Sequence, residues 1–150
     1  GETGKALTRQ VFGEDLPAAV AVQRIIRDVR LEGDAAVRRY WTQVADVGCL
    51  ICQQPAEIAH AHGGSIVERG VQIGEDYSKA KGLKLAYMDW LVLPLCPNHH
   101  RLGSTALDRD VDAFERAYGP QAEFIDYLAV RFGLNLWQLA RSRHSWAIHA

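Results

Sequence analysis

The sequence contains only three cysteines and one methionine among its 150 residues, and it has no apolar run of membrane-spanning length. An odd number of cysteines leaves one thiol unpaired, which argues against a disulfide framework. Without an apolar stretch of about 20 residues, no transmembrane helix is predicted. Residues 1–10 are polar and basic and lack the apolar core of a secretory signal. From this we expect a cytoplasmic protein.

An excess of positive charge is also lacking, because 17 basic residues face 18 acidic ones and the formal net charge is −1. A general nucleic-acid binder is normally basic, so high-affinity non-specific DNA binding is disfavoured. A nuclease site escapes this objection because a bound divalent cation reverses the charge that a phosphate meets. Basic residues do cluster over 24–39 and 79–84, where they predict either phosphate contacts or solvated faces.

Residues 1–43 predict a helical N-terminal segment. Apolar residues recur at helical spacing from Pro17 to about Gly33, and a second helix is expected over Ala35–Val44 with Asp34 as its cap. A chain of this length fits one compact domain, or one small domain with a helical appendage, and not a large two-domain enzyme.

Residues 44–134 predict a second unit, in which glycines separate short apolar runs. The strongest run, residues 90–95, predicts a strand, whereas residues 63–82 lack a clear period and predict a long mobile loop. Two amphipathic helices are expected after residue 106, separated by Gly119-Pro120. Residues 135–150 are expected to form a C-terminal tail.

The three cysteines all stand at metal-binding spacing. Cys49 and Cys52 form a C-x-x-C pair, and Cys96 and His99 form a C-x-x-H pair. A two-residue gap lets both side chains of a pair face one ion, and three thiolates with one imidazole are a common tetrahedral zinc set. The alternative is that the cysteines are small buried hydrophobes. We predict a structural zinc, and because it has no open position, any catalysis must come from neighbouring residues.

Histidines and acids crowd around these two pairs. Hydrolysis of a phosphodiester needs a base for the attacking water and a cation for the developing charge. His60 and His62 are the candidate bases, because alternation along a strand places both on one face. The catalytic Mg²⁺ or Mn²⁺ is expected at His100 and Asp108, two helical turns apart if that stretch is helical. The alternatives are that His60 and His62 are structural histidines, that His100 is a helix N-terminal residue and that Asp108 is a helix cap. Glu57 is either an acceptor that orients a histidine or an exposed carboxylate.

The order of the motifs resembles a known family. It consists of C-x-x-C at 49–52, A-E-I-A-H at 56–60, D-W-L-V-L-P-L-C-P-N-H-H at 89–100 and A-F-E-R-A-Y-G at 113–119. Over about residues 46–132 this is similar to HNH-type phage nucleases of the RecA-dependent recombination-enhancement kind. The resemblance implies an α+β fold, with a zinc-stapled ββα-metal core flanked by helices. It also implies a divalent-metal DNA endonuclease of phage or prophage recombination, with a RecA-like recombinase filament as a further partner.

By match of motif, His60 corresponds to the general base and His100 to a ligand of the catalytic cation. Many relatives have a doubled histidine where this chain has His60-Ala61, and a further histidine near Asp108. His62 and the carboxylate of Asp108 can take these places. The same departures fit an alternative, a catalytically inactive zinc module that binds DNA or a protein partner.

A second resemblance is confined to about residues 17–42. The string R-I-I-R-D-V-R-L-E-G-D-A-A-V-R-R-Y at 24–40 is similar to the N-terminal helices of histidinol dehydrogenases. None of that family's zinc, nicotinamide or catalytic residues falls within it, so it implies only a helical pair. A fragmentary dehydrogenase is the third hypothesis, and the chain length disfavours it.

Overall fold

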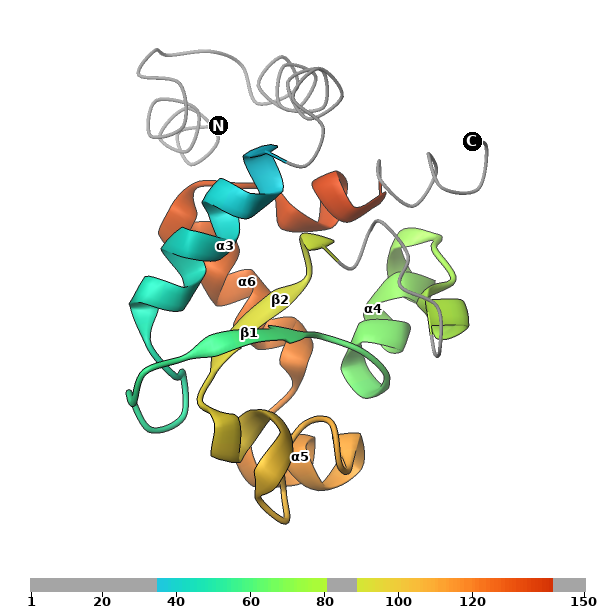
Figure 1. The fold of residues 1–150 in the computed structure, drawn as a ribbon. Helices are drawn as coiled ribbons and strands as arrows, with labels where there is room; N and C mark the ends of the chain where they lie inside the picture. Colours follow the sequence, from blue (N-terminus) through green and yellow to red (C-terminus); the bar gives the residue numbers. More distant parts are fainter. Residues whose placement is uncertain (1–34, 81–88, 142–150) are drawn as a thin grey trace.

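The computed structural model describes residues 35–80 and 89–141 of the chain (Figure 1). The expected helix from Pro17 to Gly33 and the cap at Asp34 lie outside these residues. The fold is of mixed α+β class with a small two-stranded sheet, as predicted. None of the helices within the two described ranges is long and apolar enough to cross a membrane. In chain order, the elements are α3 (Ala35–Val47), β1 (Glu57–His60), α4 (Gly64–Ile73), the 3₁₀ turn η1 (Tyr77–Ala80), β2 (Val92–Leu95), the π-helical turn η3 (Asn98–Leu102), α5 (Val111–Tyr118) and α6 (Gln121–Phe132).

The strands β1 and β2 pair in antiparallel fashion, with Glu57 opposite Leu95 and His60 opposite Val92. All of β2 is buried, as its apolar sequence predicts, although the strand begins only at Val92 and the two residues before it form a turn. Pro94 has no N–H to donate, and such a residue is tolerated in a strand only where the ladder does not need that bond. Its carbonyl accepts from the N–H of Leu50 at 3.1 Å, which ties the first cysteine pair to β2.

Helix α3 packs along the two-stranded sheet of β1 and β2, as Figure 1 shows. Val37, Tyr40 and Val44 recur at helical spacing and are all buried. The ring of Tyr40 lies 5.5 Å from that of Trp90, just before β2. The helix predicted over 35–44 is therefore confirmed and continues to Val47. The expected domain boundary near residue 44 falls inside α3, and this helix shares one hydrophobic core with β1 and β2.

The segment predicted as a long loop over 63–82 is instead largely helical up to residue 80, and that prediction was wrong. Helix α4 occupies Gly64–Ile73 and ends at Gly74, which takes the left-handed conformation typical of a helix end. Its inner face carries Ile66 and Gly70, and the latter lies so close to Tyr77 that a Cβ atom would be 2.9 Å from the ring. A glycine on the buried face hides the helical period, which explains why the sequence pattern missed this helix.

The C-terminal helices were predicted with one misplaced boundary. Helix α5 does not begin near residue 107 but at Val111, because the side chain of Asp110 accepts from the N–H of Ala113 at 3.0 Å and caps it. Residues 103–110 form turns. The expected tail begins with a helical stretch over 136–141 whose apolar residues enter the core, and the rest of it, 142–150, lies outside the described part of the chain.

Candidate metal centre and adjoining histidine cluster

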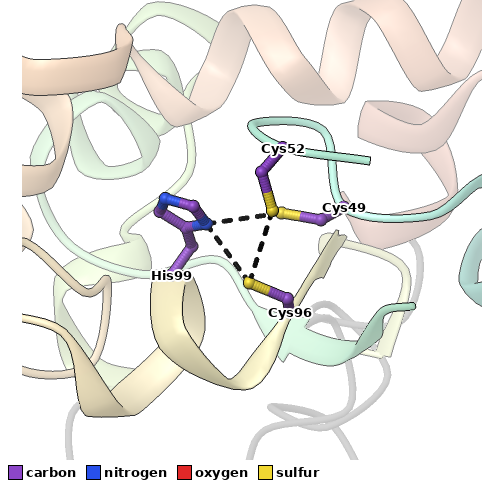
Figure 2. A group of neighbouring side chains, drawn as sticks. All are labelled: Cys49, Cys52, Cys96 and His99. Atoms are coloured by element: carbon purple, nitrogen blue, oxygen red, sulfur yellow. Dashed lines mark hydrogen bonds between the residues drawn. The ribbon is translucent and has the colours of Figure 1, made fainter. Parts of the chain in front are cut away.

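The four predicted zinc ligands come together at one point (Figure 2). The Sγ atoms of Cys52 and Cys96 are 3.7 Å apart, and Nδ1 of His99 is 3.7 Å from Sγ of Cys49 and 3.2 Å from Sγ of Cys96. Two sulfurs each about 2.3 Å from one tetrahedral ion are about 3.8 Å apart, and a sulfur and a nitrogen about 3.6 Å. The four side chains therefore fit a tetrahedral zinc ion, and the cluster could hold such a metal.

Two short backbone motifs deliver these ligands. The first pair lies in a tight turn, where the N–H of Gln53 donates to the carbonyl of Cys49 at 2.8 Å and Gly48 has a φ of +85°. The second pair joins the end of β2 to η3, so that Cys96 and His99 are separated by about one turn of helix. Both pairs are connected to β2, the first through the hydrogen bond of Leu50 and the second because it follows β2 in the chain. A bound metal would therefore link the two-stranded sheet to the turn that precedes β1.

The two thiols of the first pair differ in their surroundings. Burial raises the pKa of Cys49, but hydrogen bonds from the backbone around Cys96, Cys52 and Ile51 outweigh it, so the pKa of this thiol is lowered. The hydrogen bond from the backbone of Gln54 lowers the pKa of Cys52. Burial and the neighbouring thiols Cys96 and Cys49 raise it by more, so the net shift of this pKa is upward. Crowded thiolates repel one another, and a divalent cation removes that repulsion.

A second cluster of histidines and carboxylates lies next to the first in sequence. His62 Nε2 is 3.1 Å from Oδ1 of Asp108, and His100 Nε2 is 2.9 Å from Oδ2 of the same carboxylate. On its other side, His100 Nδ1 is 2.6 Å from Oε1 of Glu57, which also accepts from Nε of Arg101 at 2.9 Å. One carboxylate thus joins two imidazoles that come from distant parts of the chain. Asp108 is 44% exposed and His100 is 15% exposed, so the cluster opens to the surface on the side of Asp108.

Asp108 reaches His100 by a route that differs from the expected one. The expected separation of two turns held only if the stretch between them is helical, and the structure has turns there after Leu102. Instead, the turns over 103–110 bring the chain back, so that the N–H of Asp108 donates to the carbonyl of His100 and the N–H of Leu107 to that of His99, both at 2.9 Å. The neighbouring residues His99 and His100 therefore serve different clusters, because successive side chains of a helical turn point in different directions.

Glu57 proves to be the acceptor that orients a histidine. Its hydrogen bond from Arg101 and, more weakly, that from His100 lower the pKa of this carboxyl, against an opposing effect of burial. An ionised Glu57 accepts a hydrogen bond from Nδ1–H of His100, and Nε2 then faces Asp108. Nε2 of His100 and Oδ2 of Asp108, 2.9 Å apart, are both atoms that can bind a divalent cation.

The two candidate bases have different neighbours. Both were expected on one face of a strand; β1 ends at His60, and the next residue, Ala61, is buried with its N–H bonded to the carbonyl of Leu91. The ring of His60 lies edge-on to that of Trp41 in α3, with the ring centres 5.7 Å apart. His62 instead meets Asp108, so the structure brings His62, His100 and Asp108 together.

Within residues 35–80 and 89–141, the Cys/His set is the one group of three or more potential ligands whose ligand atoms all lie within 4.8 Å. The second cluster is looser than a closed metal site. No protein-family model, curated protein or solved structure matches the chain. The resemblance to HNH-type nucleases therefore stays a prediction carried by the sequence motifs.

Sequence reasoning missed two residues that shape this cluster. Arg101 directly follows the histidine pair, but this position does not predict its contact with Glu57, which lies 44 residues away. Gln121 binds the backbone of His62 from 59 residues away. A side-chain amide that pairs with a distant backbone leaves no period or spacing in the sequence, so no signal could have found it.

Proposed function

We propose that the protein is a divalent-metal-dependent DNA endonuclease of HNH type. It hydrolyses phosphodiester bonds at the histidine and carboxylate cluster, while a zinc ion at the Cys/His cluster stabilises the fold around the two strands. One observation carries the proposal: His62 and His100, from separate segments, share the carboxylate of Asp108 at 3.1 and 2.9 Å on a partly exposed surface. A base and a cation ligand must lie this close together to act on one phosphate.

In the proposed reaction His62 is the general base, since its ring is 36% exposed and can be reached by water. Nδ1 of His62, the ring nitrogen that does not face Asp108, takes a proton from a water molecule, the water oxygen forms a bond to phosphorus, and the bond from phosphorus to the leaving sugar oxygen breaks. His100 and Asp108 would hold Mg²⁺ or Mn²⁺, which when bound neutralises charge on the phosphate and on the leaving oxygen. Glu57 orients His100 through Nδ1.

Basic side chains flank this cluster although the whole chain carries a formal charge of −1. Arg101 is 51% exposed beside Glu57, and Arg109, directly after Asp108, donates to the carbonyl of Leu102 at 3.2 Å. Guanidinium groups bind phosphate oxygens well. Two guanidinium groups thus accompany the carboxylates of Glu57 and Asp108, and their affinity for phosphate oxygens supports a nucleic-acid substrate.

The direct test is cleavage of supercoiled and single-stranded DNA by zinc-loaded protein with added Mg²⁺ or Mn²⁺. Asp108→Asn should lower the rate about 100-fold or more, because the amide binds a hard cation poorly. Asp46→Asn, which alters an exposed carboxylate of α3, is the matched control and should cleave normally. Equal activity in Asp108→Asn and the parent would contradict the assignment of the site.

The alternative is a zinc-binding module that binds DNA or a protein partner without cleaving. The looser spacing of the second cluster favours it, because its ligand atoms are not all within 4.8 Å. Folded, zinc-loaded protein that binds DNA but does not cleave it with either cation would establish this alternative. Adding a RecA-like recombinase filament to the same assay tests the expected partner: cleavage that appears only with the filament would assign it. A cytoplasmic location belongs to the same proposal, because a reducing compartment keeps the thiols available for zinc.

A further inference from the structure

Gln121 is the one polar side chain in the described part of the chain that is fully buried. It is the first residue of α6 and directly follows Pro120. A buried amide needs partners for its oxygen and for its nitrogen, because leaving either unsatisfied destabilises the fold. Its partners belong to the segment that carries His62.

The amide of Gln121 binds both backbone polar groups of His62. The N–H of His62 donates to Oε1 at 3.0 Å, and Nε2 donates to the carbonyl of His62 at 2.8 Å. Backbone pairing beyond β1 reaches only as far as Ala61, whose N–H bonds to the carbonyl of Leu91. Gln121 therefore acts as a substitute strand partner for the next residue and fixes the two peptide planes that flank His62.

Glu115 in α5 holds Gln121 in this orientation. Its Oε2 accepts from the backbone N–H of Gln121 at 2.8 Å and from Nε2 at 3.3 Å. The same carboxylate accepts from the N–H and hydroxyl of Ser65 at the start of α4. Gly64, with a φ of +42°, lies against this carboxylate, and a Cβ atom there would displace Oε1 of Glu115. With acceptors on its nitrogen side and a donor on its oxygen side, the amide has one satisfactory orientation.

We propose that Gln121 is a positioning residue for His62. The direction of a Cα–Cβ bond follows from the backbone, so the two hydrogen bonds to His62 direct its imidazole toward Asp108, 3.1 Å away. The inference rests on the proposed function, in which His62 is the general base. A displacement of about 1 Å at a reacting group can cost about 100-fold in rate, so the orientation of this backbone matters for cleavage.

Gln121→Met tests this, because it removes both hydrogen bonds and keeps the length of the side chain. We expect kcat for DNA cleavage to fall about 10- to 100-fold while KM changes less than about 3-fold. Gln43→Met, at an exposed position in α3, is the control and should match the parent. Zinc content and the unfolding midpoint establish that each variant is folded. If Gln121→Met does not fold, Gln121→Asn serves instead, because it keeps the amide but is too short to reach both backbone groups.

Two further measurements separate positioning from general destabilisation. On a His62→Ala background, Gln121→Met should lower kcat no further; a full additional loss would overturn the proposal. Hydrogen exchange at the His62 amide should be at least about 10-fold faster in Gln121→Met than in the parent, and unchanged protection would also overturn it. If the parent cleaves no DNA, the proposed function fails, whereas the exchange rate still decides whether Gln121 holds His62.

Discussion

The two clusters lie side by side in the sequence, at His99 and His100, but they are built differently. The first is closed: its thiols Cys49 and Cys96 are buried, and the four ligand atoms lie within 4.8 Å of one another. The second is open, with Asp108 44% exposed, and charged side chains hold it together through hydrogen bonds. A closed set of four ligands stabilises a fold, whereas an open set of imidazoles and carboxylates leaves room for water and a substrate. Adjacent residues can therefore have separable roles, which mutations can test.

The largest expected effect is the loss of the first cluster. His99→Gln should release zinc and destabilise the protein by about 5 kcal/mol or more, because structural zinc contributes about 10–16 kcal/mol in small zinc domains. Zinc content by elemental analysis and thermal unfolding measure this. His100→Gln is the matched control one residue away, and it should keep its zinc and most of its stability. Equal zinc loss in both variants would refute the separation of the two clusters.

The next effect concerns the choice between the two candidate bases. His62→Ala should lower the cleavage rate about 100- to 1,000-fold with little change in stability, because its side chain is 36% exposed and lies outside the buried core. His60→Ala should retain cleavage within about 3-fold but lose about 1–2 kcal/mol of stability, because its ring packs on Trp41. Rates with supercoiled DNA and urea unfolding measure the pair. The reverse pattern would return the role of base to His60, as the family resemblance implies.

The sequence predicted the closed cluster better than the open one, for a physical reason. Candidate metal ligands such as Cys49 and Cys52 are placed by local spacing, which can be read directly from the chain. The contact between His62 and Asp108 depends on where β1 ends and on the turns before α5, and short turns leave only weak signals. Helix α3 was predictable because the apolar residues of its buried face recur at helical spacing. Helix α4 was not, because Gly70 occupies a core position on its buried face and interrupts that pattern.

The smallest expected effect tests how the open cluster is held. Glu57→Gln weakens the acceptor for His100 Nδ1, so cleavage should fall about 10-fold. The pKa of Glu57 is lowered by Arg101 and then by His100, so its ionised form adds stability that is fully present above its ordinary value of 4.5 and is lost as the pH falls further. The parent should therefore be more stable than Glu57→Gln by about 0.5 kcal/mol at neutral pH, and the difference should shrink in acid.

The carboxylate of Asp126 provides the control for that last comparison. Its pKa is also lowered, chiefly by the hydrogen bond from Arg69 and also by that from Trp137, so Asp126→Asn should lose stability with the same dependence on pH. Asp126 joins α6 to α4 through two contacts with Arg69, at 2.8 and 2.9 Å, and belongs to neither cluster. Cleavage should therefore stay normal in Asp126→Asn while it falls in Glu57→Gln. If both variants lost activity in proportion to their stability, the effect of Glu57 would come from the scaffold and not from the orientation of His100.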